Sequence, residues 1–319
     1  MNWRKNLEAA EFEKYIKLNG VDWPQAENGI LIASFTGWND AGESATKAVG
    51  FLSQQIEASE FANIDPEEFY AFTDTRPRVK LTNGTQRELR WPSNAFAISS
   101  DQNRPIITLV GVEPNLKWRT FAEIIFEVIK RCKIGEVVLL GALVAPVPHT
   151  RPVPLTGYTT APLRQEQLQL SGVHSSHYEG PTGILGVLNN FCQREQISCV
   201  SLWAAAPSYL AANPNWKVTA ALLTASNQIL NLGLDLSVIQ SRGFQFEEEV
   251  SEAVGRDSDV QNFVRNLETR YDNHEDEDED EDDNDWLHNE EESELPSADV
   301  LIRELEQQLG LRRNLDDDK

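Results

Sequence analysis

Apolar runs of strand length alternate with helical patterns along most of this chain. Four short runs rich in Ile, Val, Leu, Ala and Phe predict buried strands, at residues 30–35, 106–112, 137–140 and 200–204. Stretches with helical spacing lie between and after them, at residues 41–56, 118–130, 183–193, 216–232, 236–254 and 260–270. Strands that alternate with helices favour an α/β fold whose sheet is covered by helices on both faces.

An Asn-Gly pair predicts a hairpin that stands outside this alternation. Asn83 and Gly84 separate two short segments, residues 78–81 and 87–91. Asn-Gly favours a two-residue type I′ turn between antiparallel strands. We therefore expect an antiparallel hairpin insert in a fold with a mixed, mostly parallel sheet.

Charge divides the chain into a folded part and a tail. The 319 residues carry 28 Lys and Arg against 51 Asp and Glu, a net charge of −23. Fifteen of the acids lie at residues 272–294, where there is no Lys or Arg, and such a segment cannot bury enough apolar area to fold. We expect one α/β/α domain, with the parts in this order: an N-terminal arm at 1–28, the domain at 29–271, an acidic disordered linker at 272–295, an amphipathic helix at 296–311 and a polar tail at 312–319.

The rest of the composition excludes several classes of protein. Outside the acidic run no basic stripe for phosphate backbones is evident, so nucleic acid is not an expected partner. The longest apolar run is about half of the roughly 20 residues that a membrane helix needs, and the N-terminus lacks the apolar centre of a signal peptide. Cys132, Cys192 and Cys199 form no CxxC pair. We expect a reduced, cytoplasmic protein without a membrane segment.

The turn after the first buried strand is the first candidate site. Gly37, Trp38, Asn39 and Asp40 stand at the carboxyl end of that strand, the edge where open α/β folds bind ligands and partners. Backbone N–H groups at the following helix start could hold an anion. Alternatively, Asp40 caps the helix, Glu43 completes a capping box, and Trp38 packs on the sheet edge. Capping is favoured because a cap carboxylate would repel an anion.

A proline-rich loop supplies the second candidate. Residues 145–157 contain four prolines, and His149, Arg151 and Tyr158 could present a donor, a positive charge and an aromatic ring. The alternative is that Arg151 bonds to backbone carbonyls that the prolines leave without donors.

The third candidate is the segment that leads into the helix at residues 183–193. Tyr178 and Glu179 precede Thr182, which is expected to cap that helix. No metal-ligand spacing is present, so neither a metal nor a cofactor is expected. Ser208 and Tyr209 follow the last strand, but the chain has no G-x-S-x-G elbow, so no catalytic residue is expected.

Four of these segments, taken in order, resemble a known family. They read FTGWNDAG at 35–42, GAL at 141–143, YEGPTGI at 178–184 and APSY at 206–209. Together they look like a bacterial member of the proteasome assembly chaperone family, of the second-subunit type. The likeness runs from about residue 30 to 271 and includes LPSAD at 295–299. Two departures are Ser208, where the family pattern has His, and the ending NLDDDK, which lacks the hydrophobic-Tyr-any-residue docking tail.

The resemblance implies a three-layer α/β/α domain similar to phosphorylase and peptidase-like folds. It also implies self-association into a homotrimer or another small ring, and no established catalytic activity. Proteasome subunits or another protein client are the partners that it suggests.

Two hypotheses about function follow. In the first, the Trp38, His149 and Tyr178 loops form one surface for a protein client. In the second, Asp40, His149, Arg151, Tyr178 and Glu179 surround a pocket for an anionic ligand, in a small-molecule binder or an enzyme. A separate structural hypothesis is that the acidic linker lets the terminal helix reach a neighbouring subunit or a partner.

Overall fold

The computed structural model describes residues 9–20, 22–82, 86–99, 104–176, 178–210 and 214–277. The expected linker beyond residue 277, the terminal helix and the polar tail lie outside these residues. The chain divides into two compact units, which are treated separately below. The first comprises Met1–Asn39, Val49–Leu140 and Pro181–Ser201, and the second comprises Asp40–Ala48, Gly141–Gly180 and Leu202–Lys319.

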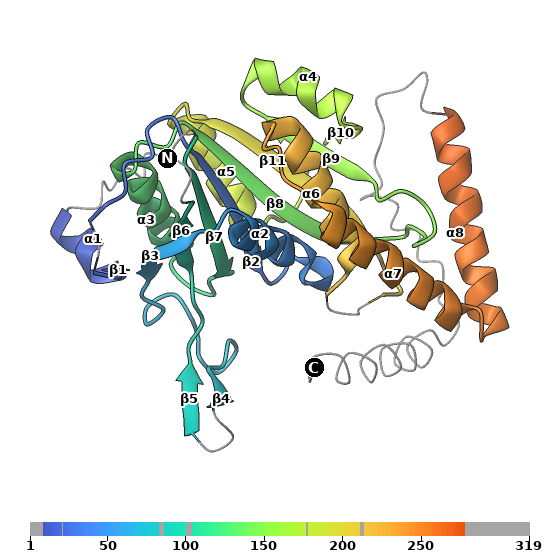
Figure 1. The fold of residues 1–319 in the computed structure, drawn as a ribbon, viewed down its shortest axis with the longest axis horizontal. Helices are drawn as coiled ribbons and strands as arrows, with labels where there is room; N and C mark the ends of the chain where they lie inside the picture. The colour runs from blue at the N-terminus through green and yellow to red at the C-terminus, as the bar shows by residue number, and fades with distance from the viewer. Residues whose placement is uncertain are drawn as a thin grey trace. The chain divides into compact units, whose positions relative to one another are not determined.

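The strands confirm the expected α/β class (Figure 1). Nine of them form a mixed sheet, in the order β1 (Ile16–Leu18), β3 (Ser59–Ile64), β6 (Ala95–Ile98), β7 (Ile106–Val112), β2 (Ile30–Thr36), β8 (Glu136–Ala145), β11 (Ser198–Pro207), β9 (Leu155–Thr159) and β10 (Val173–Ser175). The four predicted buried strands are β2, β7, β8 and β11. A separate two-stranded antiparallel sheet contains β4 (Arg78–Thr82) and β5 (Gln86–Arg90), which confirms the hairpin insert.

The helices lie close to the predicted positions. They are α1 (Ala9–Tyr15), the 3-10 turn η1 (Ala41–Glu43), α2 (Ser44–Gln55), α3 (Trp118–Arg131), α4 (Pro162–Leu170), α5 (Ile184–Arg194), α6 (Trp216–Leu230), α7 (Ser237–Val254) and α8 (Ser258–Glu277). Of these, α1 and α4 were not predicted. The α8 helix continues six residues into the stretch that was expected to be linker, and α1 and β1 lie within the expected N-terminal arm.

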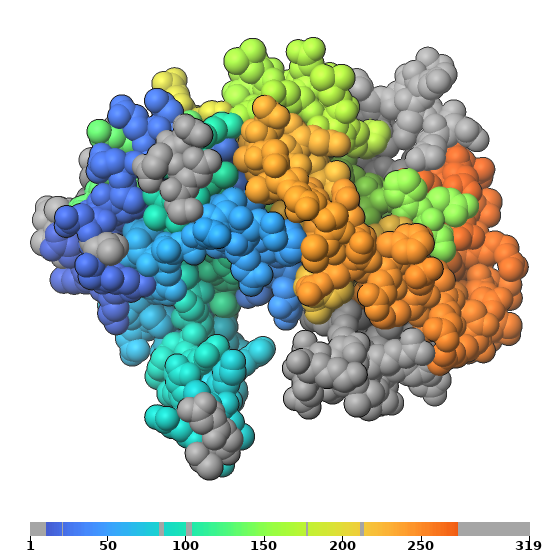
Figure 2. Space-filling model, in the orientation of Figure 1, coloured from blue at the N-terminus to red at the C-terminus, as the bar shows by residue number. Residues whose placement is uncertain are grey.

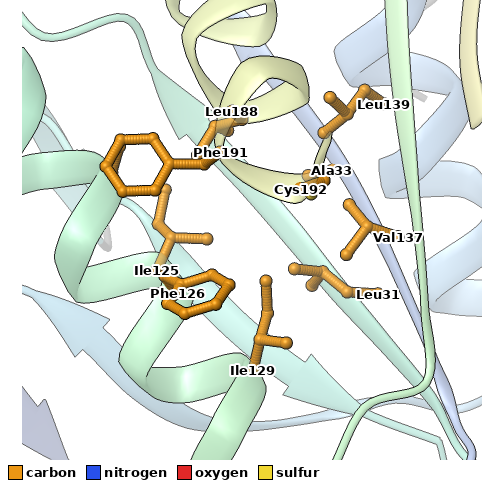
Figure 3. A pocket seen from close by; sticks show the side chains of 11 residues that line it. Leu31, Ala33, Ile125, Phe126, Ile129, Val137, Leu139, Leu188, Phe191 and Cys192 are labelled. Carbon is orange, nitrogen blue, oxygen red and sulfur yellow. The ribbon is translucent and has the colours of Figure 1, made fainter. Parts of the chain in front are cut away.

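The pairing of β2 with β7 shows which helices of the first unit pack on each face of its strands. Leu31 pairs with Ile107 and Ile32 with Thr108 in the parallel β2–β7 ladder, so alternate residues face opposite sides. The side of Leu31 packs on α3 and α5, around an apolar cavity of about 10 Å³ (Figure 3). The opposite side meets α2, because Thr108 Oγ1 donates to Ser53 Oγ at 3.1 Å. The unit thus has helices on both faces of its strands.

The second unit has a helical core of its own. Helices α6 and α7 pack together, and α7 also contacts α8. Tyr209 and Leu210, which follow β11, are buried with Phe246 of α7 and Leu267 of α8. The apolar face of α8 is therefore held by this cluster, which explains why a helix with many charged residues forms there.

Three local predictions were wrong. Gly42 (φ 62°) and Glu43 (φ 50°) are left-handed, so α2 starts at Ser44 rather than at residue 41, and the expected capping box does not form. Thr182 does not cap α5, whose N-cap position is Gly183. Thr82 pairs with Gln86, which leaves three residues between the paired ends, so the register does not match the predicted two-residue type I′ turn.

Candidate functional site

A carboxylate from the end of β7 holds the start of α5 in the first unit. Glu113 follows β7 directly, and its Oε1 accepts the backbone N–H of Ile184 at 2.8 Å. The same oxygen accepts from Asn39 Nδ2 at 2.6 Å. Glu113 therefore supplies the cap that was expected from Thr182, and its charge suits the positive end of the helix. Sequence reasoning missed Glu113, because Asp40 was singled out by its place at a helix start, whereas Glu113 directly follows a strand and lies far in the sequence from the helix that it caps.

Asn39 explains the glycine at the N-cap of α5. Asn39 is fully buried, and a Cβ added to Gly183 would lie 2.0 Å from its Oδ1. Any side chain at position 183 would displace the Asn39 amide from Glu113. Close approach of the loop to the helix start thus requires Gly183.

Trp38, Thr182 and Gly37 are the candidate residues of this unit that remain accessible. The Trp38 side chain is 52% exposed instead of packing on the sheet edge, and Thr182 is also exposed. Gly37 permits the turn with a φ of 130° and lies against the Glu113 side chain. The buried polar groups hold the loop while the indole faces solvent.

Asp40 caps α2 in the second unit, although not in the predicted way. Its Oδ1 accepts the backbone N–H groups of Ala45 at 2.6 Å and Thr46 at 3.3 Å, and its Oδ2 accepts from the Thr46 hydroxyl. The carboxylate accepts from residues five and six positions later in the chain, because the left-handed turn at Gly42 and Glu43 lies between Asp40 and the start of α2. Those N–H groups are therefore occupied, and they are not available to an anionic ligand.

Burial makes Asp40 sensitive to pH. Desolvation raises its pKa from 3.8 to about 6, against hydrogen bonds that lower it. The folded state binds the proton of the Asp40 carboxyl more tightly than the unfolded chain does. The stabilisation from this protonation is therefore complete below pH 3.8, and it is lost as the pH rises through 6. Relative to wild type, Asp40→Asn should gain about 3 kcal/mol in unfolding free energy between pH 3.8 and 7. Urea unfolding at four pH values measures this, and a constant difference between the two proteins would contradict the prediction.

His149 and Tyr209, two candidate residues of the second unit, are hydrogen-bonded to each other. The Tyr209 hydroxyl accepts the His149 backbone N–H at 2.7 Å and lies 2.6 Å from Nδ1. The hydroxyl therefore bridges the backbone and the ring of His149. On the other side of the ring, Nε2 lies 3.1 Å from Ser251 Oγ, within hydrogen-bond distance. Ser251 on α7 had no signal in the sequence.

Burial opposes a catalytic role for the pair. A histidine that activates a serine has to work beside a substrate, whereas this imidazole is enclosed by the protein. The imidazole is buried, with 3% of the residue exposed, and Lys217 Nζ bonds to the His149 carbonyl and lies 2.7 Å from Glu247. The cluster is a satisfied buried network that fixes the proline loop.

Arg151 binds α8 through two carboxylates. Its Nε and Nη2 donate to the two oxygens of Asp272, each at 2.7 Å, and Nη1 lies 3.5 Å from Glu268. The Thr150 hydroxyl also donates to Glu268. Neither sequence interpretation, ligand binding or bonds to proline-loop carbonyls, anticipated this bidentate pair. Glu268 and Asp272 lie four residues apart on one helix face, a weak signal that could have indicated a basic partner.

The other candidates of the second unit lie at its surface. Tyr158 is 41% exposed and Tyr178 37% exposed, and Glu179 is exposed as well. Ser208 donates its backbone N–H to the Ala145 carbonyl at 2.9 Å. The expectation that all three loops form one surface joins residues of both units, and it stays a prediction.

No group of three His, Cys, Asp or Glu side chains among the described residues is placed to hold a metal ion. No helix in the described part of the chain is long and apolar enough to span a bilayer.

Comparison with known proteins adds a family and a fold. A sequence profile of the PAC2 family matches residues 34–254. A PAC2 family protein from Streptomyces avermitilis is 33% identical, with a TM-score of 0.66 over 74% of this chain and 99% of that chain. A proteasome-assembly chaperone homologue from Mycobacterium tuberculosis is 35% identical, with the same TM-score and coverage.

More distant likeness supports the fold alone. An archaeal proteasome activator from Pyrococcus furiosus is 18% identical, with a TM-score of 0.60 over 75% of this chain and 98% of that chain. No curated protein sequence matches this chain.

Proposed function

Since this chain belongs to the PAC2 family, we propose that it is a non-enzymatic, self-associating chaperone that binds a protein client. The observation that carries the proposal is the 35% identity to a proteasome-assembly chaperone homologue over 99% of that protein. Proteasome subunits are therefore the first clients to test. The three cysteines are free and buried, which supports a reducing, cytoplasmic setting.

The bonding of the candidate residues supports binding over catalysis. Asp40 caps a helix, His149 is hydrogen-bonded to Tyr209 and Ser251, and Arg151 is bound by Asp272 and Glu268. A reaction would need such groups to face a substrate. An anionic ligand would have to displace Asp272 from Arg151, which disfavours the pocket hypothesis.

Exposed aromatic side chains support a protein-binding surface. Trp38, Tyr158 and Tyr178 are each more than a third exposed, although each adjoins a loop held by buried polar bonds or by prolines. Rigidly held aromatic residues provide large contact areas and are common hot spots in protein interfaces. We assign Trp38 the role of a central contact with the client.

Co-purification with matched variants tests this function. The tagged full-length chain should retain proteasome subunits or another folding client at physiological salt, and light scattering should give the mass of a small ring, a trimer in our proposal. Trp38→Ala should reduce the retained client about tenfold, as for an interface hot spot. Phe244→Ala, which removes a 65% exposed aromatic ring on α7, should retain it. A monomer without a client would contradict the proposal.

A further inference from the structure

The hairpin presents an apolar face that no described element covers. Val79 pairs with Leu89 and Leu81 with Arg87, so Val79, Leu81 and Leu89 lie on one face of β4 and β5. These three side chains are 61%, 58% and 52% exposed, and every residue of both strands is exposed. The hairpin forms a separate finger of cyan atoms in Figure 2.

This exposure is unusual for so small a sheet. An isolated two-stranded hairpin is at best marginally stable in water and needs packing against a further element. At its base Trp91 packs edge-on against Phe72 at 4.7 Å, which anchors only that end. Clustered exposed apolar residues indicate an interaction surface. The remainder of the hairpin is therefore suited to an external partner.

Charge determines the chemistry of that partner. Residues 76–91 carry five exposed basic residues against one acid, Glu88, in a protein of net charge −23. The basic residues are Arg76, Arg78, Lys80, Arg87 and Arg90. Arg78 lies directly opposite Arg90, a like-charge pair that weakens a hairpin, and Glu88, with Oε2 3.6 Å from Arg90 Nη2, offsets it only in part. The partner must therefore bring acidic groups as well as apolar side chains.

Two simple occupants fail this requirement. The hairpin of a second copy would bring one basic surface against another, which charge repulsion opposes. A nucleic acid would satisfy the basic residues, but it would leave the apolar side chains of Val79, Leu81 and Leu89 uncovered. An acidic peptide segment with leucines satisfies both.

The chain itself contains such a segment. Between residues 278 and 294 it has eleven acids and no Lys or Arg. Beyond them, Leu301, Leu305 and Leu309 have the spacing of one helix face. Such a short amphipathic helix is marginal alone and is stabilised by a surface to pack on. At roughly 3.3 Å per residue, the acidic stretch can extend on the order of 55 Å, enough to reach a neighbouring molecule.

We propose that the basic, apolar hairpin of one copy binds residues 278–311 of a second copy. The acidic stretch pairs with the arginines, and the leucine face covers Val79, Leu81 and Leu89. Because each copy carries both partners, the contact is head-to-tail, which is the kind of interface that closes a ring. This inference rests on the self-association in the proposed function.

Photo-cross-linking from the hairpin tests the contact. Benzoylphenylalanine in place of Leu81 in the full-length chain is irradiated in an equal mixture of unlabelled and ¹⁵N-labelled copies. The cross-linked peptides should come from residues 278–311 and should join labelled to unlabelled chains. The same group in place of Leu163, an 87% exposed leucine on α4, should give no such products.

A charge reversal tests the electrostatic part. Arg87→Glu should reduce the cross-link yield about fivefold, as expected when an exposed ion pair becomes a repulsion. Arg265→Glu, on the exposed surface of α8, should leave it unchanged. Both effects are measured at low salt, and 0.5 M salt should lower the wild-type yield.

Other outcomes overturn the inference. Cross-links only within one copy, between hairpins or to another protein would each assign a different occupant. If the mass shows an oligomer but the cross-links are absent, this contact fails and the proposed function stands. If the mass shows a monomer, the self-association in the proposed function fails first.

Discussion

Phe121→Ala is expected to lower the free energy of unfolding by about 3–5 kcal/mol, the range for deleting a buried aromatic ring. Phe121 on α3 is fully buried, and its ring contacts those of Phe35 at 5.9 Å and Phe69 at 5.3 Å. Alanine would remove both edge-on contacts and leave a cavity in the first unit. Urea unfolding followed by circular dichroism measures the loss.

An exposed phenylalanine provides the control for this result. Phe244 on α7 is 65% exposed, so Phe244→Ala should change the unfolding free energy by less than about 0.5 kcal/mol. A cost below 1 kcal/mol for Phe121→Ala would show that the aromatic cluster does not stabilise the unit as described.

Acid is expected to destabilise the protein through His149, by roughly 3–4 kcal/mol. Burial lowers the pKa of His149 from 6.5 to about 4, with a smaller contribution from the charge of Lys217. The unfolded chain binds this proton more readily than the folded state. The stability is therefore present above pH 6.5 and is lost as pH falls towards 4.

Two measurements isolate this effect from the titration of other groups. In the wild-type protein, the His149 ring resonances should show no titration midpoint above pH 5 in an NMR pH series. His149→Gln cannot take up a proton, so its unfolding free energy should fall less than that of wild type between pH 6.5 and 4. A midpoint near 6.5 would contradict the buried, neutral imidazole.

Asp40 responds to pH in the opposite direction. A buried acid favours the folded state at low pH, whereas a buried base favours it at high pH. The two groups together predict that the Asp40→Asn and His149→Gln variants shift the stability profile in opposite directions.

Continuous apolar runs predicted the central strands well. Residues 30–35, 106–112, 137–140 and 200–204 each form part of a buried strand. Strands β1, β3, β6, β9 and β10 were missed because they are short or half-exposed, and their place in the sheet comes from pairing with residues distant in the sequence. The α4 helix was missed because only Leu168 within it is buried, so no apolar stripe marks it.

The candidate site was only partly accessible from the sequence. Asp40 was correctly identified as a capping residue, but two left-handed residues changed which N–H groups it accepts. Arg151 was singled out by its charge and its stiff loop. Its partners on α8 could not be deduced, since they lie more than a hundred residues away in the sequence.

The sequence by itself determined the fold class, the order of the main elements, the hairpin insert and the family, because these follow from local patterns of apolar residues, turns and motifs. The tertiary structure decided which polar groups are occupied. Glu113 reaches Ile184 across 71 residues and His149 reaches Ser251 across 102. A hydrogen bond needs its two atoms within about 3 Å in a fixed direction, and only the folded chain brings such distant residues together.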